Sequence, residues 1–305
     1  MKYVTCKSSL KKIYTRLGLD KTKINDYVIA YNNLEIKKNM LHYYSGRQLS
    51  KEEEIAINFL KTNPLTVFPY EFVRKYNISD ISVFKDLSNN LYYVNHNSKK
   101  LFFPKGMSKF EIKKYYSEML REQDLNSPHR YLVNGFLVNE GDIVLDVGSA
   151  EGIFVLDVIE LATHVYIFEP DEKWIAPLKA TCDPWKDKIT IVNQYVSDSD
   201  TDTSLRLDTY CKDFISHINF IKMDVEGTES RVISGAKKIL ALNEKIILTI
   251  CTYHNQSDYE EFRDIFQKLH FSIEHSDGFM IFYNDRMFAE PYLRRGLLRA
   301  KRNEI

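Results

Sequence analysis

The chain has 305 residues, enough for one large domain or for a medium-sized domain with a smaller one. Basic and acidic side chains balance at 42 each, which argues against a dedicated nucleic-acid binder, because such proteins usually carry a basic excess. No apolar run approaches the length of a transmembrane helix, and the N-terminus lacks the apolar stretch of a signal peptide, so a cytoplasmic location is expected. Four scattered cysteines without a C-x-x-C pair are expected to be reduced thiols: Cys6, Cys182, Cys211 and Cys251.

The N-terminal part, residues 1–107, is predicted to form a helical and β-hairpin module. Residues 1 to about 62 have a helical pattern, and residues 81–103 contain short aromatic and β-branched runs broken by Ser-Asn-Asn and His-Asn-Ser. Such runs predict a small β-meander or hairpin. Two capping boxes predict helix starts, one formed by Ser50 and Glu53 and the other by Ser108 and Glu111.

The main domain is predicted over residues 108–290, where strand and helix patterns alternate from Ile143 onward. Apolar strands joined by helical crossovers predict an α/β fold with a mainly parallel sheet covered by helices on both faces. The last two strands are close together and are expected to form an antiparallel hairpin at the sheet edge. The expected strands are 143–147, 165–169, 189–196, 220–224, 245–252, 271–274 and 279–283, and the expected helices are 153–161, 174–181, 232–240 and 259–269.

The last fifteen residues, 291–305, form a basic tail with the sequence PYLRRGLLRAKRNEI. Two interpretations fit this composition. It is either a solvated terminal helix or a segment that contacts an anionic membrane or a polyanionic glycan. The solvated helix is favoured, because so few apolar residues bind lipid weakly.

A glycine turn in VLDVGSAEG follows the first predicted strand of the main domain. Asp146 ends an apolar run, Gly148 and Gly152 flank the turn, and Glu169 ends the next apolar run about twenty residues on, the spacing at which an acid reaches ribose hydroxyls. A pyrophosphate favours bare backbone amides without a nearby carboxylate. Asp146 therefore favours a ligand with a ribose and an ammonium group but no phosphate, and S-adenosylmethionine (SAM) fits this description better than NAD does.

A second segment, IKMDVEG, is expected to deliver polar side chains to the same edge of the sheet. Lys222, Asp224 and Glu226 come at the carboxyl end of a strand, and Gly227 permits the turn into the next helix. Ligands in open parallel sheets bind outside the carboxyl ends of the strands. We therefore expect these side chains to converge with Asp146, Glu169 and His254.

The ordered set VLDVGSAEG, FEPD, Val196-Ser197-Asp198, Leu207-Asp208-Thr209 and IKMDVEG…VISGA resembles the FkbM family of SAM-dependent O-methyltransferases over residues 125–283. The resemblance implies a Rossmann-like class I methyltransferase sheet and a sugar or glycan hydroxyl as the methyl acceptor. Many members have an Asn in the first glycine turn, whereas this chain has Ser149-Ala150-Glu151. Glu151 either accepts a hydrogen bond from the cofactor or caps the following helix, whose N-terminus favours a carboxylate.

The chemistry of SAM suggests roles for the residues at this edge. Asp146 and the turn at Gly148, Ser149 and Gly152 are expected to hold the methionyl part, and Glu169 is expected to bind the ribose diol. Ser197 and Asp198 are expected to face the adenine, although Asp198 also suits a plain turn. The segment Ser127–Tyr131 either closes over the carboxylate end of the cofactor or simply ends a helix.

Methyl transfer to a hydroxyl requires an in-line geometry and removal of the hydroxyl proton. His254 is the predicted general base, because the usual pKa of histidine, about 6.5, suits proton acceptance near neutrality. Asp224 is predicted to orient His254, to contact the cofactor or substrate, or to act as the base itself. Lys222 is expected to pair with Asp224 or Glu226, since residues two apart on a strand share a face.

Carboxylates suit Mg²⁺, and Asp224, Glu226 and Asp208 are compatible with it, but the chain has no compact ligand motif and no metal is predicted. An NAD-linked oxidoreductase is the first alternative, disfavoured by the G-x-x-x-G spacing and by Asp146. A methyltransferase-fold interaction protein without turnover is the second, disfavoured by the intact polar residues. A nucleic-acid methyltransferase is disfavoured by the lack of a basic excess and of an N/D-P-P-Y/F tetrapeptide.

Overall fold

The computed structural model describes residues 21–283, 285 and 288–302, and the side chains from residue 29 onward. The chain divides into two compact units: residues up to 71 together with 281–293, and residues 72–280 together with 294–305. The predicted boundary after residue 107 therefore lies inside the second unit. Cys6 lies outside the described residues.

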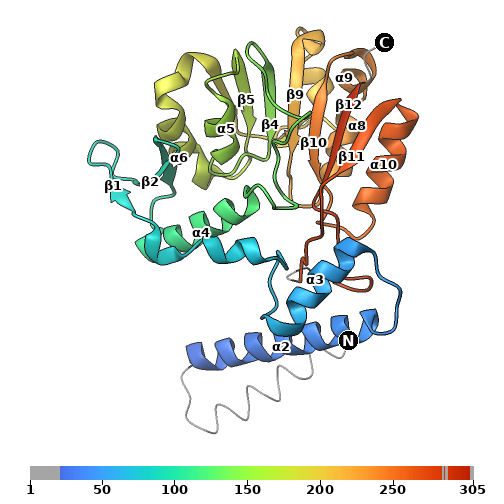
Figure 1. The fold of residues 1–305 in the computed structure, drawn as a ribbon. Helices are drawn as coiled ribbons and strands as arrows, with labels where there is room; N and C mark the ends of the chain where they lie inside the picture. Colours follow the sequence, from blue (N-terminus) through green and yellow to red (C-terminus); the bar gives the residue numbers. More distant parts are fainter. Residues whose placement is uncertain (1–20, 284, 286–287, 303–305) are drawn as a thin grey trace. The chain divides into compact units, whose positions relative to one another are not determined.

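The first unit contains the helices α2 (Lys21–Tyr44) and α3 (Lys51–Thr62), shown in blue in Figure 1. The predicted capping box at the start of α3 is confirmed, because Ser50 Oγ accepts the Glu53 N–H at 3.2 Å and Glu53 Oε2 accepts the Ser50 N–H at 2.8 Å. The apolar face of α3 is buried. The hydroxyl of Tyr44 donates to the carbonyl of Pro291, which ties α2 to the later segment of the same unit.

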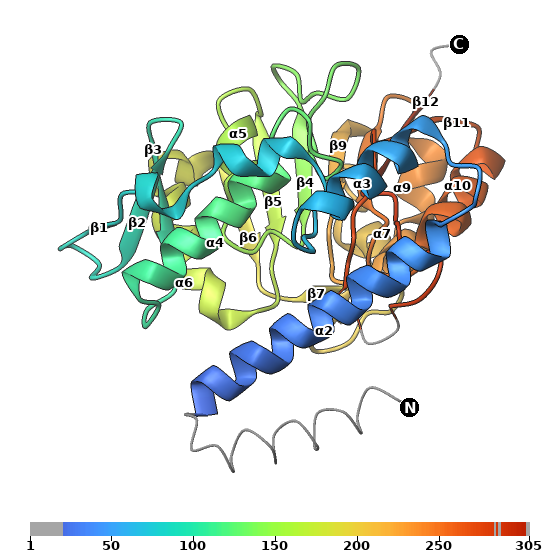
Figure 2. The same cartoon turned by 60° about the horizontal axis from the view of Figure 1, so that its bottom comes forward.

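The second unit begins with the short helices η1 (Glu71–Lys75) and η2 (Ile78–Asp80) and the strands β1 (Phe84–Lys85), β2 (Tyr92–His96) and β3 (Lys99–Phe103). These strands form an antiparallel sheet in the order β1-β2-β3, which confirms the predicted meander. Strand β3 lies beside helix α6 (Glu172–Cys182), where the Phe102 N–H donates to Thr181 Oγ1 at 3.0 Å (Figure 2). The second capping box is confirmed at the start of α4 (Lys109–Glu122).

A seven-stranded sheet with the order β11-β12-β10-β9-β4-β5-β6 is the centre of the second unit (Figure 1). Strands β10, β9, β4, β5 and β6 are parallel, and β12 is antiparallel to both of its neighbours. This confirms the predicted α/β fold with a mostly parallel sheet and an antiparallel edge. The strands are β4 (Ile143–Val147), β5 (His164–Phe168), β6 (Ile189–Val192), β9 (Ile218–Met223), β10 (Ile247–Cys251), β11 (Phe271–His275) and β12 (Leu297–Arg302).

One face of the sheet packs on α7 (Leu207–Tyr210), α8 (Glu229–Gly235), α9 (Lys237–Leu242) and α10 (Asp258–Lys268). The alternation of strand side chains decides this packing: Leu145 and Val147 of β4 join that core, whereas Asp146 points to the other face. On that other face Phe154 of α5 (Ile153–Val158) stacks on Phe220 of β9. The remaining short elements are η3 (Asp183–Lys188), β7 (Tyr195–Val196), β8 (Ser204–Leu205) and η4 (Ile215–His217).

The antiparallel edge differs from the prediction in its partner strand. The predicted strand 279–283 does not form, and β12 from the end of the chain lies between β10 and β11 instead. Leu297, Leu298 and Ala300 are buried there, and Arg302 donates to the carbonyls of Leu269 and Leu240. The prediction of a solvated or membrane-contacting tail is therefore wrong for residues 297–302, because their apolar side chains complete the sheet.

No helix in the described part of the chain is long and apolar enough to cross a membrane. Cys182, Cys211 and Cys251 are buried free thiols. Burial raises the pKa of the Cys182 and Cys211 thiols to about 12, which keeps them protonated and unreactive at neutral pH.

Candidate active site

A cavity of about 790 Å³ lies at the carboxyl ends of the parallel strands, within the second unit. Its wall follows the strand order, with Tyr253 after β10, Asp224 after β9, Gly148 after β4, Glu169 after β5 and Gln194–Val196 after β6. Side chains of α4 complete the wall. The volume falls within the range of about 300–1,000 Å³ that is typical of small-molecule sites.

The glycine turn after β4 is held against the end of β9. The Gly148 N–H donates to the carbonyl of Phe168 at 2.9 Å, and the Asp224 N–H donates to the carbonyl of Val147 at 3.0 Å. Gly148 has φ +79°, and a Cβ atom at this position would lie 1.8 Å from the carbonyl oxygen of Asp224. Glycine is therefore required at 148 both for the conformation and for the close approach of the two backbones. Gly152, also in the left-handed region, directly precedes α5.

Asp146 and Lys222 form a buried ion pair across neighbouring strands. The sheet register places them side by side on β4 and β9, and Lys222 Nζ lies 3.1 Å from Asp146 Oδ1. Burial alone would lower the pKa of Lys222, but the charges of Asp146 and Asp224 outweigh it and raise the pKa. Lys222 also donates to the Gly148 carbonyl. Asp146 itself does not line the cavity, and its carboxylate is already paired with the ammonium group of Lys222. It is therefore not placed to hold the ammonium group of a ligand, as the sequence had led us to expect.

Glu169 lies in the cavity wall and supports the glycine turn. Its Oε2 accepts the Ala150 N–H at 2.7 Å, and its Oε1 accepts the Asp171 N–H at 2.8 Å. A carboxylate has about four lone-pair sites, so two remain for a ligand. Burial raises the pKa of Glu169, and the two backbone hydrogen bonds limit the rise.

Glu151, at which the chain differs from the usual FkbM pattern, is buried and lines the cavity. Its Oε2 accepts a hydrogen bond from the hydroxyl of Tyr115 on α4 at 3.0 Å. Burial raises the pKa of Glu151 to about 7, although the Tyr115 hydrogen bond and the charge of Lys222 favour the ionised form. No side chain caps the start of α5, where Gly152 is the N-cap, so the alternative of Glu151 as a helix cap is not supported.

The wall beyond Glu169 is largely aromatic. Phe168, Trp174, Tyr195 and Val196 line it, and Trp174 lies against Tyr115 with ring centroids 5.7 Å apart. The predicted adenine contacts Ser197 and Asp198 do not line the cavity.

Asp198 instead forms an exposed ion pair with Arg231, with Oδ1 2.9 Å from Nη2. Ser197 is buried, and its carbonyl group lies close to Gly235. Its hydroxyl group donates a hydrogen bond to the Asp198 carboxylate. Since β6 ends at Val192, the chain has already turned away from the cavity at residues 197–198.

Asp224 is the carboxylate with the most polar contacts in the cavity wall. Its Oδ2 accepts the hydroxyl of Tyr131 at 2.7 Å and lies 3.6 Å from His129 Nε2. Burial would raise its pKa, but the hydrogen bond from His129 and the charges of Lys222 and His254 outweigh burial and hold the pKa well below the usual range. The segment Ser127–Tyr131 therefore reaches the site by contacting Asp224.

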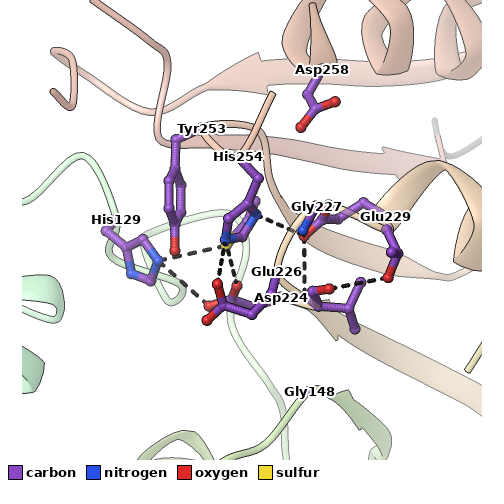
Figure 3. A network of polar contacts seen from close by, with 12 residues as sticks. His129, Gly148, Asp224, Glu226, Gly227, Glu229, Tyr253, His254 and Asp258 are labelled. Atoms are coloured by element: carbon purple, nitrogen blue, oxygen red, sulfur yellow. Dashed lines mark hydrogen bonds and ion pairs between the residues drawn. The ribbon is translucent and has the colours of Figure 1, made fainter. Parts of the chain in front are cut away.

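His254 lies behind this wall among three carboxylates (Figure 3). Its Nδ1 is 2.9 Å from Glu229 Oε1, and its Nε2 is 3.5 Å from Glu226 Oε2 and 3.7 Å from Asp224 Oδ1. Burial would lower its pKa, but the three carboxylates raise it to about 10.

At neutral pH His254 is therefore a cation without a lone pair for proton acceptance, and it does not line the cavity. The sequence-based role of His254 as general base does not fit this geometry. Arg294 holds the backbone in place by donating to the carbonyls of Tyr253 and His254 at 2.8 and 2.7 Å.

Cavity residues that the sequence did not single out include Tyr115 and Glu122 on α4 and Tyr253 after β10. Tyr131 lies in the segment 127–131, for which a contact with the cofactor was one of the two expectations. Helix α4 is amphipathic, and this pattern predicts a buried face but not a cavity wall. Tyr253 directly precedes His254, so the sequence pointed to the correct strand end but to the neighbouring residue.

Beside the cavity, two groups of three described residues have metal-ligand atoms within 4.8 Å of one another: His129, Asp224 and Cys251, and Asp224, Glu229 and His254. The pKa of the Cys251 thiol is raised well above its usual value by burial, so the thiol is protonated. The imidazole of His254 is cationic. Asp208 accepts the backbone N–H groups of Lys238 and Ile239 at the start of α9 and does not line the cavity. A metal would have to displace protons from these groups, so no metal is assigned to them.

Solved structures with a similar fold include two that are named as methyltransferases and one named TrmK. The methyltransferase FkbM of Methylobacillus flagellatus KT is 18% identical with a TM-score of 0.44, covering 63% of this chain and 53% of that chain. The precorrin-6y C5,15-methyltransferase of Geobacter metallireducens GS-15 is 8% identical with a TM-score of 0.40, covering 69% of this chain and 97% of that chain. TrmK of M. capricolum, solved with S-adenosyl-homocysteine (SAH), is 11% identical with a TM-score of 0.37, covering 57% and 70%.

The chain thus spans about half the length of the first of these structures. At this level of similarity the fold assignment depends on the strand order itself. No curated protein sequence matches the chain. The family model described as the methyltransferase FkbM domain matches residues 178–277, which include β9, the IKMDVEG segment and β10. The part of the chain that is similar to the methyltransferase FkbM domain is therefore residues 178–277.

Proposed function

We propose that this protein is a SAM-dependent O-methyltransferase that methylates a hydroxyl group of a sugar or glycan. The observation that carries the proposal is the cavity at the carboxyl ends of β4, β5 and β9, where a glycine turn and a buried acid, Glu169, lie side by side. The family match over residues 178–277 supports the methyltransferase activity. The sugar or glycan acceptor rests on the resemblance of the motifs to the FkbM family.

The charge of the cavity favours SAM over a dinucleotide. Six carboxyl groups and two ammonium groups line it, and Glu151 lies in the turn where a dinucleotide would place its pyrophosphate. A diphosphate is repelled by nearby carboxylates, whereas a sulfonium cation is attracted by them. The list of charged lining residues is Glu122, Glu151, Glu169, Asp171, Asp224, Glu226, Lys173 and Lys222.

The positions along the strand order suggest how SAM is held. Glu169 has lone pairs free for the ribose hydroxyls, and the aromatic wall of Phe168, Trp174 and Tyr195 suits the adenine. The turn at Gly148 and Ser149 would hold the methionyl part, with Glu151 beside the ammonium group. When bound, SAM supplies an electrophilic methyl group, and the chain must orient the acceptor hydroxyl and remove its proton.

Calorimetry with SAM, SAH and NAD tests the cofactor. We expect SAM and SAH to bind and NAD not to bind; binding of NAD without SAM or SAH contradicts the proposal. Transfer of a tritium-labelled methyl group from SAM to a panel of methyl glycosides tests the acceptor class.

Glu169→Gln should weaken SAH binding, because it removes the charge that faces the ribose and leaves one oxygen for two backbone amides. Loss of one charge-assisted hydrogen bond corresponds to about 1.5–3 kcal/mol, or about 10-fold to 150-fold in affinity. The matched control is Glu172→Gln, an exposed acid three residues along the chain that does not line the cavity. Equal SAH affinity in the two variants contradicts the ribose role of Glu169.

A further inference from the structure

The charged side chains of the cavity differ in whether they have partners. Lys222 pairs with Asp146, Lys173 pairs with Asp171, and Glu226 pairs with His254. Glu151, Glu169 and Asp224 accept hydrogen bonds from Tyr115, from backbone amides and from Tyr131. Among the described residues, Glu122 is the one charged side chain of the cavity wall without a hydrogen bond or ion pair. Its carboxyl group is therefore available to a ligand.

Glu122 also lies at the end of the cavity where an acceptor would bind. It is the last residue of α4, and its negative charge acts on Tyr131 and Tyr253, which line the cavity near β4 and β10. The proposed ribose and adenine contacts lie near β5 and β6. From β5 to β9 is two strand spacings, about 10 Å, so a methyl group held near Gly148 would lie between the two ends of the cavity.

The negative surroundings of Glu122 affect its strength as a base. Burial raises its pKa well above the usual value, and the neighbouring negative charges add to the rise. Those charges come from the turn after β4, from the segment after β9 and from α4 itself, and the cavity's phenols complete the set of titratable neighbours: Asp224, Glu151, Glu118, Glu226, Tyr115, Tyr131 and Tyr253. A carboxylate with a higher pKa is a stronger base and works best when its pKa lies nearer the working pH.

We propose that Glu122 is the general base that accepts the proton of the acceptor hydroxyl, an inference that rests on the proposed methyltransferase function. The acceptor oxygen forms a bond to the methyl carbon, the carbon–sulfur bond breaks, and its electron pair stays on sulfur, which becomes a neutral thioether. The hydroxyl proton moves to the Glu122 carboxylate, which becomes a neutral carboxylic acid. Atoms and charge balance with SAM as the only co-reactant.

The other candidate bases suit this step less well. Asp224 is held in its ionised form by His129, Lys222 and His254, which makes it a weak base. His254 is cationic and lies outside the cavity wall. His254 instead acts with His129 and Lys222 to keep the Asp224 carboxylate ionised. The Tyr131 hydroxyl, which donates to this carboxylate, lines the cavity.

The test compares Glu122→Gln with the wild type and with Glu118→Gln. Glu118 lies one turn earlier on α4, is paired with Arg121 and does not line the cavity, so it is a matched control. In methyl transfer from labelled SAM to the methyl glycosides, Glu122→Gln should lower kcat by about 10²-fold or more, while SAH affinity by calorimetry stays unchanged. Glu118→Gln removes only one of the neighbouring charges, so it should lower kcat far less than Glu122→Gln does and leave SAH affinity unchanged.

Equal kcat in Glu122→Gln and the wild type overturns the role of Glu122 but not the proposed function. Absence of SAH binding by the wild type, or of transfer to any of the glycosides, overturns the proposed function and this inference with it. The wild-type kcat should also rise with pH above the usual pKa of glutamate, about 4.3, and a kcat that is flat from pH 5 to 8 overturns the inference even if the variant fails to fold.

A readout without turnover is the pH dependence of urea unfolding. A carboxyl group with a raised pKa in the folded state binds more protons there than in the unfolded state, so stability falls as pH rises from the unfolded pKa toward the folded one. The urea midpoint of the wild type should therefore fall relative to that of Glu122→Gln over this window. Glu118→Gln retains Glu122, so its midpoint should fall with pH as that of the wild type does. Parallel pH curves for the wild type and Glu122→Gln overturn the inference.

Discussion

Lys222 Nζ lies 3.1 Å from Asp146 Oδ1, and both side chains are almost fully buried between the sheet and the residues that cover it. The pair arises directly from the register of β4 and β9, in which these two residues are neighbours. It places a fixed cation below the glycine turn, where Lys222 also holds the Gly148 carbonyl. The ion pair thus links the sheet to the part of the cavity that would bind the cofactor.

Removal of one member of this pair should be strongly destabilising. Lys222→Met leaves the Asp146 carboxylate buried without its partner, which costs about 3–5 kcal/mol. Urea unfolding measures the loss. The double variant Asp146→Leu with Lys222→Met removes both charges and should be more stable than Lys222→Met alone; if the two variants are equally stable, the pair does not act as a unit.

Gly148→Ala should destabilise the protein more than a glycine substitution at a similar φ elsewhere. The new Cβ would lie 1.8 Å from the Asp224 carbonyl oxygen, so β4 and β9 must separate locally. Gly141 has φ +91°, and a Cβ atom added there would have no neighbouring atom within 4 Å. Gly141→Ala should therefore lower the free energy of unfolding only by the cost of the left-handed conformation, about 1–2 kcal/mol. Urea unfolding compares the two, and equal losses would show that the close approach relaxes freely.

The imidazole of His254 should titrate near pH 10 and not near 6.5. Asp224, Glu226 and Glu229 face it and raise its pKa to about 10 in the folded protein, with Asp258 nearby. Since its folded pKa is raised, the stability that this group contributes is complete below the unfolded pKa of about 6.5 and is lost as pH rises toward 10.

Titration of the histidine resonances by nuclear magnetic resonance measures this directly, with His254→Gln to assign the signal and the exposed His217 as the internal control. A His254 resonance that titrates near 6.5 would restore His254 as a candidate base.

Glu151 should make the binding of SAM depend more strongly on pH than the binding of SAH. Its pKa is raised to about 7, so its carboxyl group gains a negative charge between about pH 6 and 8 in the presence of Tyr115, Lys222 and Asp146. The ammonium group, which SAM and SAH share, is attracted by this charge in both ligands, and the sulfonium of SAM is attracted in addition, whereas the thioether of SAH is neutral. Calorimetry should therefore show the SAM-to-SAH affinity ratio rising with pH in the wild type and staying constant in Glu151→Gln. A ratio with the same pH dependence in both proteins rules out this role.

The chain sequence determined the architecture of the second unit, because local patterns carry that information. Both capping boxes form at the predicted residues, and the run of apolar strands with helical crossovers gives the parallel sheet. The glycine turn and the acid that ends the next strand lie together, since carboxyl ends of parallel strands meet at one edge. The FkbM resemblance is confirmed over residues 178–277, which contain Val196-Ser197-Asp198, Leu207-Asp208-Thr209 and IKMDVEG. The motifs VLDVGSAEG and FEPD lie before the matched residues.

Only the tertiary structure decided which partners these groups have. Residues 297–302 read as a basic tail, yet they insert into the sheet, because strand pairing depends on distant segments that periodicity along the chain does not register. From the sequence, His254 is expected to be a neutral base near pH 7, but three carboxylates from the segment after β9 raise its pKa and make it a cation. Glu122 belongs to an ordinary amphipathic helix in the sequence and faces a cavity in the fold. The protonation state of a side chain, and whether it is free to contact a ligand, depend on its neighbours in space. The sequence therefore located the site, and the folded chain decided its chemistry.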